Sequence, residues 1–531
     1  MSHARLLSIE VCRFKSYREA SRLDLKPLTV LVGRNSSGKS TMVQALLLLK
    51  QTLESPRADA PLSLVGAVEA LGLRELTHGW PDVVGQNDGP VFKLVMESKL
   101  DLGRALRSTQ NTTEKVLVER GGIVGLRQRR SQETSVVRTT VTLRFKDDGR
   151  RAALSSVELL SEGEIYKQSL RVSIFNDADG FILVGSELTS NIQVEWDHFI
   201  PHLTLKSRLG PRDNDRVRHN LWLFRFEQPL EDLRALLRGF GFLGSTRATP
   251  PTLYRVSASE PPDHVGVSGE YAAEVLHARR SDVVHYLPPL SLAGNVPSIP
   301  ERVRAKPLVD AVNDVFRELG IEDGVSIDDI QDVGFRLLFG RATLQHVGRG
   351  FTYLLPLVEY GLLLDPARFV GEARDVPRVE FSSGLTRYAL AAFEEPEAHI
   401  HPKLQAKLAH WFVALAMSGR NLIVETHSDH FVRRLRGLVA RAPAGGELER
   451  WLRENVSVVE VTKGADGAST LCATSLDDRG GFERWPADFM DAATEEEREI
   501  YDAGLDKPVP TEVRRGPEEV RHDEGDEPEE P

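Results

Sequence analysis

The sequence predicts an α/β protein: a mixed central sheet flanked by helices, with an inserted antiparallel β lobe and a helical subdomain. Three observations predict this class. A buried apolar strand, a glycine-bounded loop and a helix follow one another in residues 28–49. Residues from about 90 to 235 are rich in alternating and β-branched runs. Alternating helix and strand patterns return from Asp332, so the insertion divides one α/β unit into two segments.

The first element is a pair of short strands within Ala4–Asp24, separated by the turn Phe14-Lys15-Ser16-Tyr17. We expect them to be edge strands that lead into the apolar strand starting at Leu28. Residues 1–90 then form the N-terminal half of the α/β unit.

The glycine-bounded loop fits the phosphate-binding pattern Gly-x-x-x-x-Gly-Lys-Ser/Thr, with a strand before it and a helix after it. Glycines allow the tight turn, and the amides and positive end of the following helix can face phosphate oxygens. The helix is expected from Ser40 to Thr52 and should stop near Ser55-Pro56. Lys39 should reach the β/γ-phosphates of ATP, and the Ser40 hydroxyl should bind Mg²⁺. The predicted nucleotide-binding residues of this loop are Gly33, Asn35, Ser36, Ser37, Gly38, Lys39, Ser40 and Thr41.

Residues 91–235 form the predicted β lobe, with runs such as 136–145 and 169–175 punctuated by Asp/Gly turns. Two stretches in it, 120–130 and 206–218, are locally basic. They fit either a solvated loop surface or a contact to a phosphate backbone.

Residues 236–330 are expected to form a connecting helical subdomain. Helical patterns occur at 230–240, 270–280 and 306–319, and Gly320 ends the last of them. Residues 331–475 complete the α/β unit, with strands at 387–393 and 421–426 and a helix from Pro402 to Met417. Residues 476–531 are a C-terminal extension, and its acidic tail reads as disordered.

Two adjacent carboxylates end the strand at 387–393. Because ligands of open α/β sheets lie at the carboxyl ends of the strands, they should face the glycine loop. We assign Glu394 to Mg²⁺, directly or through water, and Glu395 to polarising the attacking water. His427 ends the next strand and is assigned to contact with the γ-phosphate. The alternative for the glutamates is a solvated strand end. The alternative for His399, His401, His427 and His430 is a metal cluster, although their spacing matches no zinc pattern.

Composition excludes little. Eight acids and one arginine in residues 516–531 account for most of the net charge of −11, and the remaining chain is close to neutral. Charge therefore neither favours nor excludes nucleic acid as a partner. The two cysteines, Cys12 and Cys472, are expected to be reduced thiols. Neither a membrane span nor a signal peptide is recognisable, so we expect a cytoplasmic protein that does not bind membranes.

Four motifs occur in order: FKSY, GRNSSGKST, FEEPEAHIHP and ETHSDHF. This set resembles the ATP-binding-cassette (ABC) type ATPases of the RecF, structural-maintenance-of-chromosomes (SMC) and overcoming-lysogenisation-defect (OLD) group. With FLGSTRATP, HVGVSGEYAAEVL, VGRGFTYLLP and GGFERWPADFMD, it is similar to bacterial AAA-family ATPases of genome-maintenance and phage-defence loci. The resemblance covers most of residues 4–491.

The resemblance implies a P-loop ATPase head that forms a homodimer around ATP, each head giving a signature loop to the partner's nucleotide. Here the signature is residues 348–353, with Gly350 and Thr352 as nucleotide contacts and a helix Leu354–Leu364 behind it. His401-Pro402 would face the partner head. The chain departs from the broad family at Glu394, where an aspartate is usual, and at Thr352-Tyr353 in the signature. No glutamine loop, coiled-coil arm or C-terminal nuclease domain is recognised.

We therefore expect an ATP-hydrolysing switch that acts with DNA, with a neighbour-encoded effector protein, or with both, in DNA repair or antiviral defence. The alternative is a scaffold that binds ATP without hydrolysing it and holds an effector inactive. A third hypothesis is a nuclease in its own right.

Overall fold

Two sheets and the helices packed on them organise the part of the chain that is described. The computed structural model describes residues 3–79, 88–101, 134–148, 152–163, 170–177, 180–184, 192–205, 213–255, 264–331, 333–365 and 389–484. All of these belong to one unit, Met1–Phe489. The basic stretch 120–130, residues 206–212 and the acidic tail lie outside the described residues, so the predictions made for them stay predictions.

The central sheet has six strands in the order β11-β19-β20-β3-β21-β22. The first five pair in parallel and β22 closes the sheet antiparallel to β21. The register sets Glu394 beside Glu425 and Glu425 beside Leu31. The carboxyl ends of these strands therefore meet at one edge of the sheet, as expected from the sequence. The strands are β3 (Leu28–Val32), β11 (Gly241–Leu243), β19 (Ala389–Glu394), β20 (Arg420–Glu425), β21 (Val456–Lys463) and β22 (Ser469–Thr474).

Both faces of this sheet are covered, which is why β3 and β20 are buried along their whole length. Alternate residues such as Leu31, Ala392 and Ile423 join the core cluster that contains helix α1 (Lys39–Glu54). On the opposite face, the Phe393 ring packs edge-on against Phe412, 5.3 Å away between ring centroids. Helices α8 (Arg349–Leu363), α9 (Pro402–Met417) and α10 (Asp429–Arg441) cover that face.

The second sheet is antiparallel and has the order β2-β1-β4-β5-β6-β7-β8. Its first two strands are the predicted N-terminal pair, which therefore does not flank β3: β1 pairs with β4, so the N-terminal strands and the predicted β lobe form one sheet. The sequence could not show this, because pairing partners are chosen by tertiary packing. The strands are β1 (His3–Cys12), β2 (Ser21–Asp24), β4 (Asp88–Asp101), β5 (Thr134–Asp147), β6 (Ala152–Gly163), β7 (Leu170–Asp177) and β8 (Gly180–Val184).

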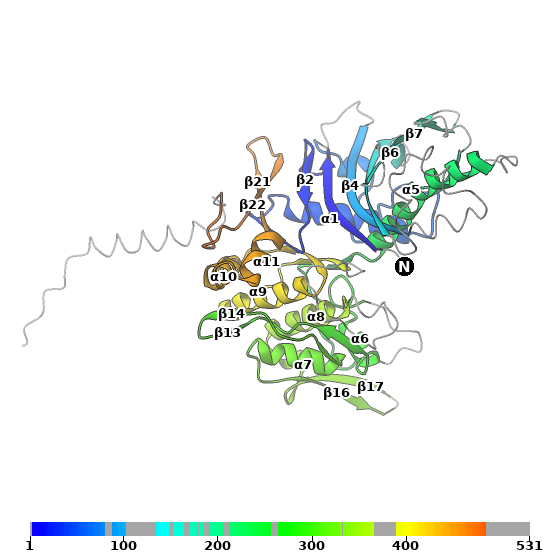
Figure 1. The fold of residues 1–531 in the computed structure, drawn as a ribbon. Helices are drawn as coiled ribbons and strands as arrows, with labels where there is room; N and C mark the ends of the chain where they lie inside the picture. Colours follow the sequence, from blue (N-terminus) through cyan, green and yellow to red (C-terminus); the bar gives the residue numbers. More distant parts are fainter. Residues whose placement is uncertain are drawn as a thin grey trace, which may run out of the picture. The chain divides into compact units, whose positions relative to one another are not determined.

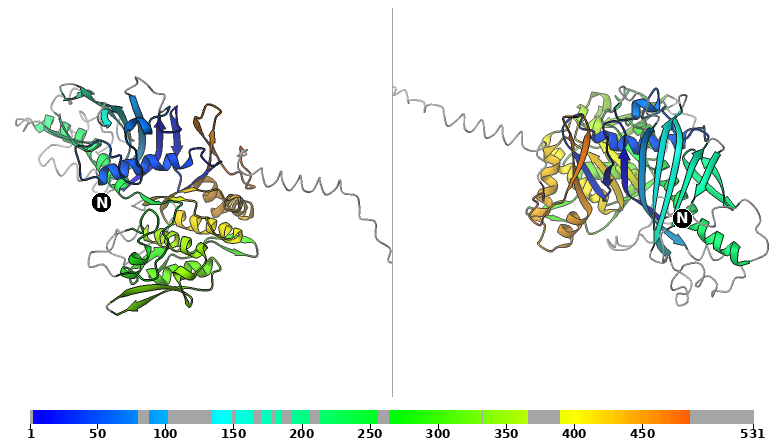
Figure 2. Two further views of the ribbon diagram at one scale, coloured as in Figure 1. Left: turned by 180° about the vertical axis from the view of Figure 1, so that it is seen from behind. Right: turned by 90° about the horizontal axis from the view of Figure 1, so that it is seen from above.

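Helix α1 lies between the two sheets, and its leucines Leu46–Leu49 are all buried. Figures 1 and 2 show α1 along the face of the N-terminal strands, with α5 (Asp213–Arg238) beside it. The predicted helix at 230–240 is the last part of α5. The hairpin β9 (Ile192–Asp197) and β10 (Ile200–Leu205) packs on α5, and the short helix α2 (Leu73–Leu76) packs on β4. As predicted, α1 ends before Ser55-Pro56.

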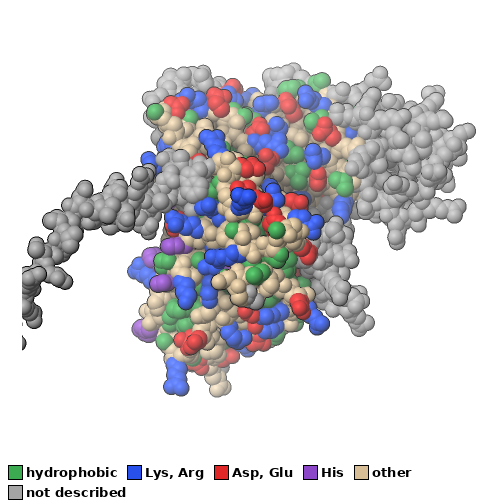
Figure 3. Space-filling model, turned by 60° about the vertical axis from the view of Figure 1, so that its left-hand side comes forward, with side chains coloured by type: hydrophobic (Ala, Val, Ile, Leu, Met, Phe, Trp, Pro, Cys, Tyr) green, Lys and Arg blue, Asp and Glu red, His purple; other side chains and the backbone are tan. Residues whose placement is uncertain are grey.

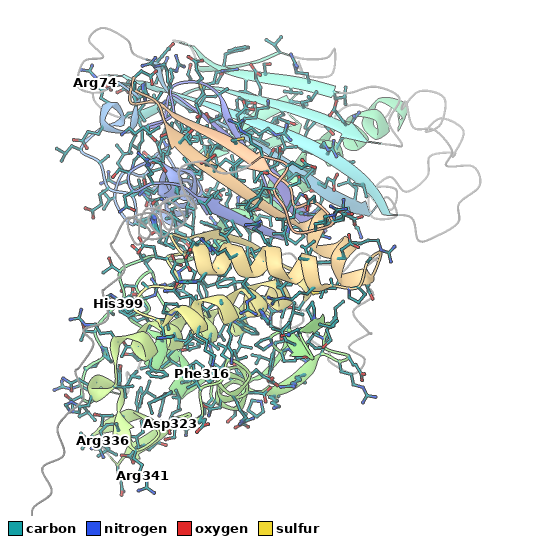
Figure 4. The ribbon with its side chains drawn as sticks, turned by 90° about the vertical axis from the view of Figure 1, so that its left-hand side faces the viewer. Arg74, Phe316, Asp323, Arg336, Arg341 and His399 are labelled. Atoms are coloured by element: carbon teal, nitrogen blue, oxygen red, sulfur yellow. The ribbon has the colours of Figure 1, made fainter. Side chains whose placement is uncertain are left out.

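A third group of elements lies below the central sheet in Figure 1. It contains the predicted helices at 270–280 and 306–319. The second helix begins at Leu308, later than predicted, because Arg304–Pro307 is a strand. The buried Phe316 of this group is labelled in Figure 4. The domain boundary expected between residues 330 and 331 falls inside the β16–β17 hairpin. The elements are α6 (Ala272–Ala278), β12 (Val283–Tyr286), β13 (Ser291–Ala293), β14 (Val296–Ser298), β15 (Arg304–Pro307), α7 (Leu308–Glu318), β16 (Val325–Ile330), β17 (Gly334–Phe339), β18 (Ala342–Thr343) and η2 (Leu344–His346).

The C-terminal helices complete the unit. Helix α9 has the bounds predicted from the sequence, and α11 (Glu447–Asn455) precedes β21. Among the described residues, no helix combines the length and the apolar character needed to cross a membrane. The sequence class, a mixed α/β unit with a large antiparallel sheet, is confirmed.

Arg420 fastens the start of β20 to the helix layer. Its side chain is 1% exposed, and its guanidinium donates to the carbonyls of Gly361 (3.0 Å) and His285 (3.1 Å). Burial lowers the pKa of Arg420 to about 10, which leaves it charged at neutral pH. Without the guanidinium, the Gly361 and His285 carbonyls would lose this donor.

We expect Arg420→Met to lower the free energy of unfolding by about 3 kcal/mol, because buried acceptors lose their donor. Chemical denaturation followed by circular dichroism measures this. The matched control is Arg433→Met, since Arg433 forms a half-exposed ion pair with Asp429, and it should change stability by less than about 1 kcal/mol. Equal losses in both variants would contradict the role given to Arg420.

Candidate functional site

The glycine loop leaves β3 and turns sharply into α1. Gly33 has φ 142° and Gly38 has φ 108°, and Ser36 is also left-handed at φ 60°. A Cβ on Gly33 would lie 2.3 Å from the Val461 carbonyl oxygen. Gly38 is the N-cap of α1, and no side chain caps the helix, so no capping side chain keeps an anion from its first amides. These glycines are required by conformation and by space.

A pocket of about 450 Å³ opens at this loop, at the carboxyl edge of the central sheet. It brings together segments that are far apart in the sequence. Eight of the predicted site residues line it, and four further residues do so as well. The lining residues are Lys15, Ser16, Asn35, Ser36, Gly38, Lys39, Ser40, Thr41, Gln44, Glu395, Glu425 and His427.

Lys39 lies across the loop. Its ammonium donates to the carbonyl oxygens of Gly33 (3.0 Å) and Arg34 (2.9 Å). Burial lowers the pKa of Lys39, and the neighbouring carboxylate of Glu425 opposes that shift. These hydrogen bonds hold the Lys39 ammonium at the pocket, between the glycine loop and the acidic strand ends.

Glu425 is the residue that sequence reasoning missed. It ends β20, and its Oε1 accepts a hydrogen bond of 2.9 Å from the Ser40 hydroxyl, 385 positions away. Burial raises the pKa of Glu425 to about 7, helped by the charge of Glu394 and opposed by Ser40 and Lys39. The signal in the sequence is an acid as the last residue of an apolar strand, two positions before His427.

Glu394 and Glu395 leave the end of β19 in different directions. Glu394 does not line the pocket; its Oε2 accepts from the Ser245 amide at 3.4 Å, and burial raises its pKa. Glu395 lines the pocket and has φ 44°, a left-handed conformation that costs a non-glycine residue about 1 kcal/mol. Its amide donates to the Glu425 carbonyl at 2.8 Å, which fixes this turn.

His427 faces Glu395 across the pocket, with 4.0 Å between Nε2 and Oε1. Its backbone amide donates to the buried Glu397 carboxylate at 2.6 Å. Burial lowers the pKa of the His427 imidazole, and the charge of Lys39 lowers it further, so the ring is neutral at pH 7. Glu397 had no predicted role, and it holds the turn that presents His427.

The signature segment lies away from this pocket. Helix α8 begins at Arg349, so the predicted start at Leu354 is wrong, and residues 349–353 are the first turn of the helix. Gly350 lies against the His399 carbonyl, where a Cβ would be 2.8 Å from the oxygen. The Thr352 hydroxyl donates to the Arg349 carbonyl at 2.8 Å. Neither Gly350 nor Thr352 lines the pocket of its own chain.

The loop after Glu395 packs on this first turn. The Tyr353 ring meets the His399 ring edge-on, 4.7 Å between centroids, and Figure 4 places His399 at the margin of the helix layer. His401 is the N-cap of α9 and accepts from the Lys403 amide at 3.3 Å, with Pro402 at the first helical position. The pair His401-Pro402 thus has a local capping role, and its predicted place facing a partner head stays a prediction.

Two remote segments hold the glycine loop in place. The Tyr17 hydroxyl donates to the Gly38 carbonyl at 3.1 Å. From β22, the Ser469 hydroxyl donates to the Ser37 carbonyl at 2.6 Å, and the Ser469 amide donates to the Ser16 carbonyl at 2.8 Å. The FKSY turn and the last strand of the sheet therefore clamp the loop from either side, and Ser37, which does not line the pocket, is held at this contact.

We expect Ser469→Ala to weaken nucleotide binding about fivefold, because the loss of one hydrogen bond of about 1 kcal/mol loosens the loop. Titration with a fluorescent ATP analogue measures the affinity. Thr470→Ala is the matched control: its hydroxyl pairs with Thr462 on the same hairpin and does not touch the loop. Equal affinities in wild type and Ser469→Ala would show that the clamp does not act on binding.

A family model for the AAA ATPase domain matches residues 5–101 and 378–432, which include the glycine loop, Glu394, Glu395, Glu425 and His427. No curated protein matches the chain.

Solved structures similar to the chain include three SMC head domains. An SMC head bound to the C-terminal winged-helix domain of ScpA has 11% identity and a TM-score of 0.37, with 89% of this chain and 98% of that chain covered. A head with an extended coiled coil bound to ScpA, from Pyrococcus furiosus, has 12% identity, a TM-score of 0.35 and coverages of 94% and 100%. The head from Thermotoga maritima has 12% identity, a TM-score of 0.33 and coverages of 88% and 98%. The chain is thus similar to the AAA ATPase domain over two segments that lie far apart in the sequence, and these segments contain the glycine loop and the acidic strand ends of the central sheet.

Proposed function

We propose that the chain binds ATP with Mg²⁺ at the glycine loop and hydrolyses it, and that the cycle opens and closes a pair of heads. One observation carries this proposal. The phosphate-binding elements Lys39 and Ser40 and the strand-end groups Glu395 and His427 line a single pocket, although they come from opposite ends of the chain.

The residues in and beside the pocket have different proposed roles. Loop amides from Ser37 to Thr41, together with Lys39, hold the phosphates of ATP. The Ser40 hydroxyl would hold Mg²⁺, with Glu394 supporting it through water, and the ion would supply positive charge to offset that of the phosphates. Glu395 orients and polarises the attacking water, and the ring N–H of His427 donates to a γ-phosphate oxygen.

The residues present fit a divalent cation. The hydroxyl of Ser40 and three carboxylates lie at one edge of the sheet, and hard oxygen donors are what Mg²⁺ prefers. Among the described residues, no group of three or more acids, histidines and cysteines is arranged to hold a metal by itself. A cation here is therefore completed by phosphate oxygens and water, as is usual for magnesium in ATPases.

The proposal includes a homodimer of heads. Its support is that the first turn of α8 carries Gly350 and Thr352 outside the pocket of its own chain. A second chain would supply this turn to complete the site. The partner that the dimer grips is proposed to be DNA, an effector protein, or both; acidic and basic side chains are interspersed on the face shown in Figure 3, without one dominant charge. DNA repair and antiviral defence are the proposed roles.

We expect Glu395→Gln to reduce steady-state phosphate release by about 10²-fold or more, because the group that polarises the water is lost. A phosphate-release assay measures this. The same variant should accumulate an ATP-bound dimer, observed by analytical ultracentrifugation, since binding is intact and reopening is blocked. If wild type and variant both release phosphate at the same negligible rate, the non-hydrolysing scaffold is the better description.

We expect Lys39→Ala to weaken ATP binding by about 10- to 100-fold, because a charged donor to the phosphates is removed, and to abolish ATP-dependent dimerisation. Calorimetry and ultracentrifugation with a slowly hydrolysed ATP analogue test the two effects. Lys463→Ala, an exposed lysine on β21, serves as the control and should behave as wild type. Undiminished dimerisation of Lys39→Ala would contradict the assigned site.

A further inference from the structure

We infer that Glu425 is a direct protein ligand of the Mg²⁺ at this site, next to Ser40, and that Glu394 acts one shell further out. This inference rests on the proposed function, because it concerns the cation that accompanies ATP. It adds a metal-binding residue at a position to which the nucleotide-binding motifs assign none.

The contact that carries the inference joins Glu425 to the predicted magnesium ligand. The Ser40 hydroxyl donates to Oε1 of Glu425 at 2.9 Å, so both side chains already face the same point of the pocket. A hydroxyl oxygen and a carboxylate oxygen at this separation can both bind one small cation. The cation would then take the place of the hydrogen bond between them.

The second oxygen of Glu425 is unsatisfied. The residue is 5% exposed, and its Oε2 is buried without a hydrogen-bond partner in the part of the chain that the structure describes. Buried carboxylates are normally paired with a donor or bound to a metal, because an isolated charge loses its hydration. Lys39 does not meet this need, since its ammonium donates to the Gly33 and Arg34 carbonyls.

Strand order separates the roles of Glu425 and Glu394. Strand β20 is the direct neighbour of β3, from which the loop and Ser40 follow, whereas β19 lies one strand beyond it. One strand adds about 4.8 Å. Glu394 is also turned to the Ser245 amide and does not line the pocket. The carboxylate that binds the cation directly is therefore Glu425, and Glu394 reaches the same ion only through water.

The test uses Mn²⁺ as the probe and the full chain. Glu425→Gln keeps the size of the side chain and an oxygen that can accept from Ser40, but removes the charge. Electron paramagnetic resonance counts free Mn²⁺ in the presence of a non-hydrolysable ATP analogue, and a fluorescent analogue reports nucleotide affinity in EDTA.

We expect Glu425→Gln to weaken Mn²⁺ binding at least about tenfold while nucleotide affinity in EDTA is not reduced. The retained EDTA affinity also shows that the variant is folded. Glu460→Gln is the matched control, because Glu460 is a similarly buried acid of the same sheet, 6% exposed, that does not line the pocket; its Mn²⁺ affinity should equal that of wild type.

Two results would overturn the inference while leaving the proposed function in place. One is unchanged Mn²⁺ affinity in Glu425→Gln when wild type binds Mn²⁺ with the nucleotide. The other is an equal loss of nucleotide affinity with metal and in EDTA, which would mean that Glu425 shapes the pocket rather than binding the cation. If wild type binds neither nucleotide nor Mn²⁺, the proposed function itself fails.

Discussion

The parallel pairing of β19, β20 and β3 is the constraint on which the site depends. It sets Glu394 beside Glu425 and Glu425 beside Leu31, just before the glycine loop. Parallel strands end at the same edge, so the acids and the phosphate-binding loop must meet there. Burial of both faces of the sheet, by α1 and by the layer of α8, α9 and α10, makes this pairing rigid, and Arg420 fastens β20 to that layer.

The meeting of these groups at one edge also explains why several pocket residues have shifted pKa values. Glu395, Glu425, Lys39 and His427 line one pocket, with Glu394 beside it, and burial raises the pKa values of Glu394 and Glu425 while it lowers those of Lys39 and His427. A cation and a polyanion bound together would stabilise the charged forms of these side chains, because each ligand brings charge opposite to that of its neighbours. Shifts of this kind gather at functional sites.

The glycine loop obtains its shape from segments outside the motif. The Tyr17 and Ser469 hydroxyls donate to the carbonyls of Gly38 and Ser37, and the β21 carbonyl of Val461 leaves no room for a side chain at Gly33. The first turn of α8, by contrast, is held by the loop that follows Glu395 and has no contact with its own pocket. The glycine loop is thus held by contacts within one chain, whereas the first turn of α8 does not line the pocket of its own chain.

The sequence by itself determined the local elements: the loop pattern at 33–40, the strand that ends at Glu394, and α9 to the residue, because these depend on neighbours in the chain. It placed the end of the next strand at His427, two residues beyond the observed end at Glu425. It did not determine that β1 pairs with β4, that α8 starts at Arg349, or that Glu425 meets Ser40. Those facts depend on which distant surfaces pack together. An acid at the end of an apolar strand is unremarkable until the register of β20 against β3 places it beside a hydroxyl 385 positions away.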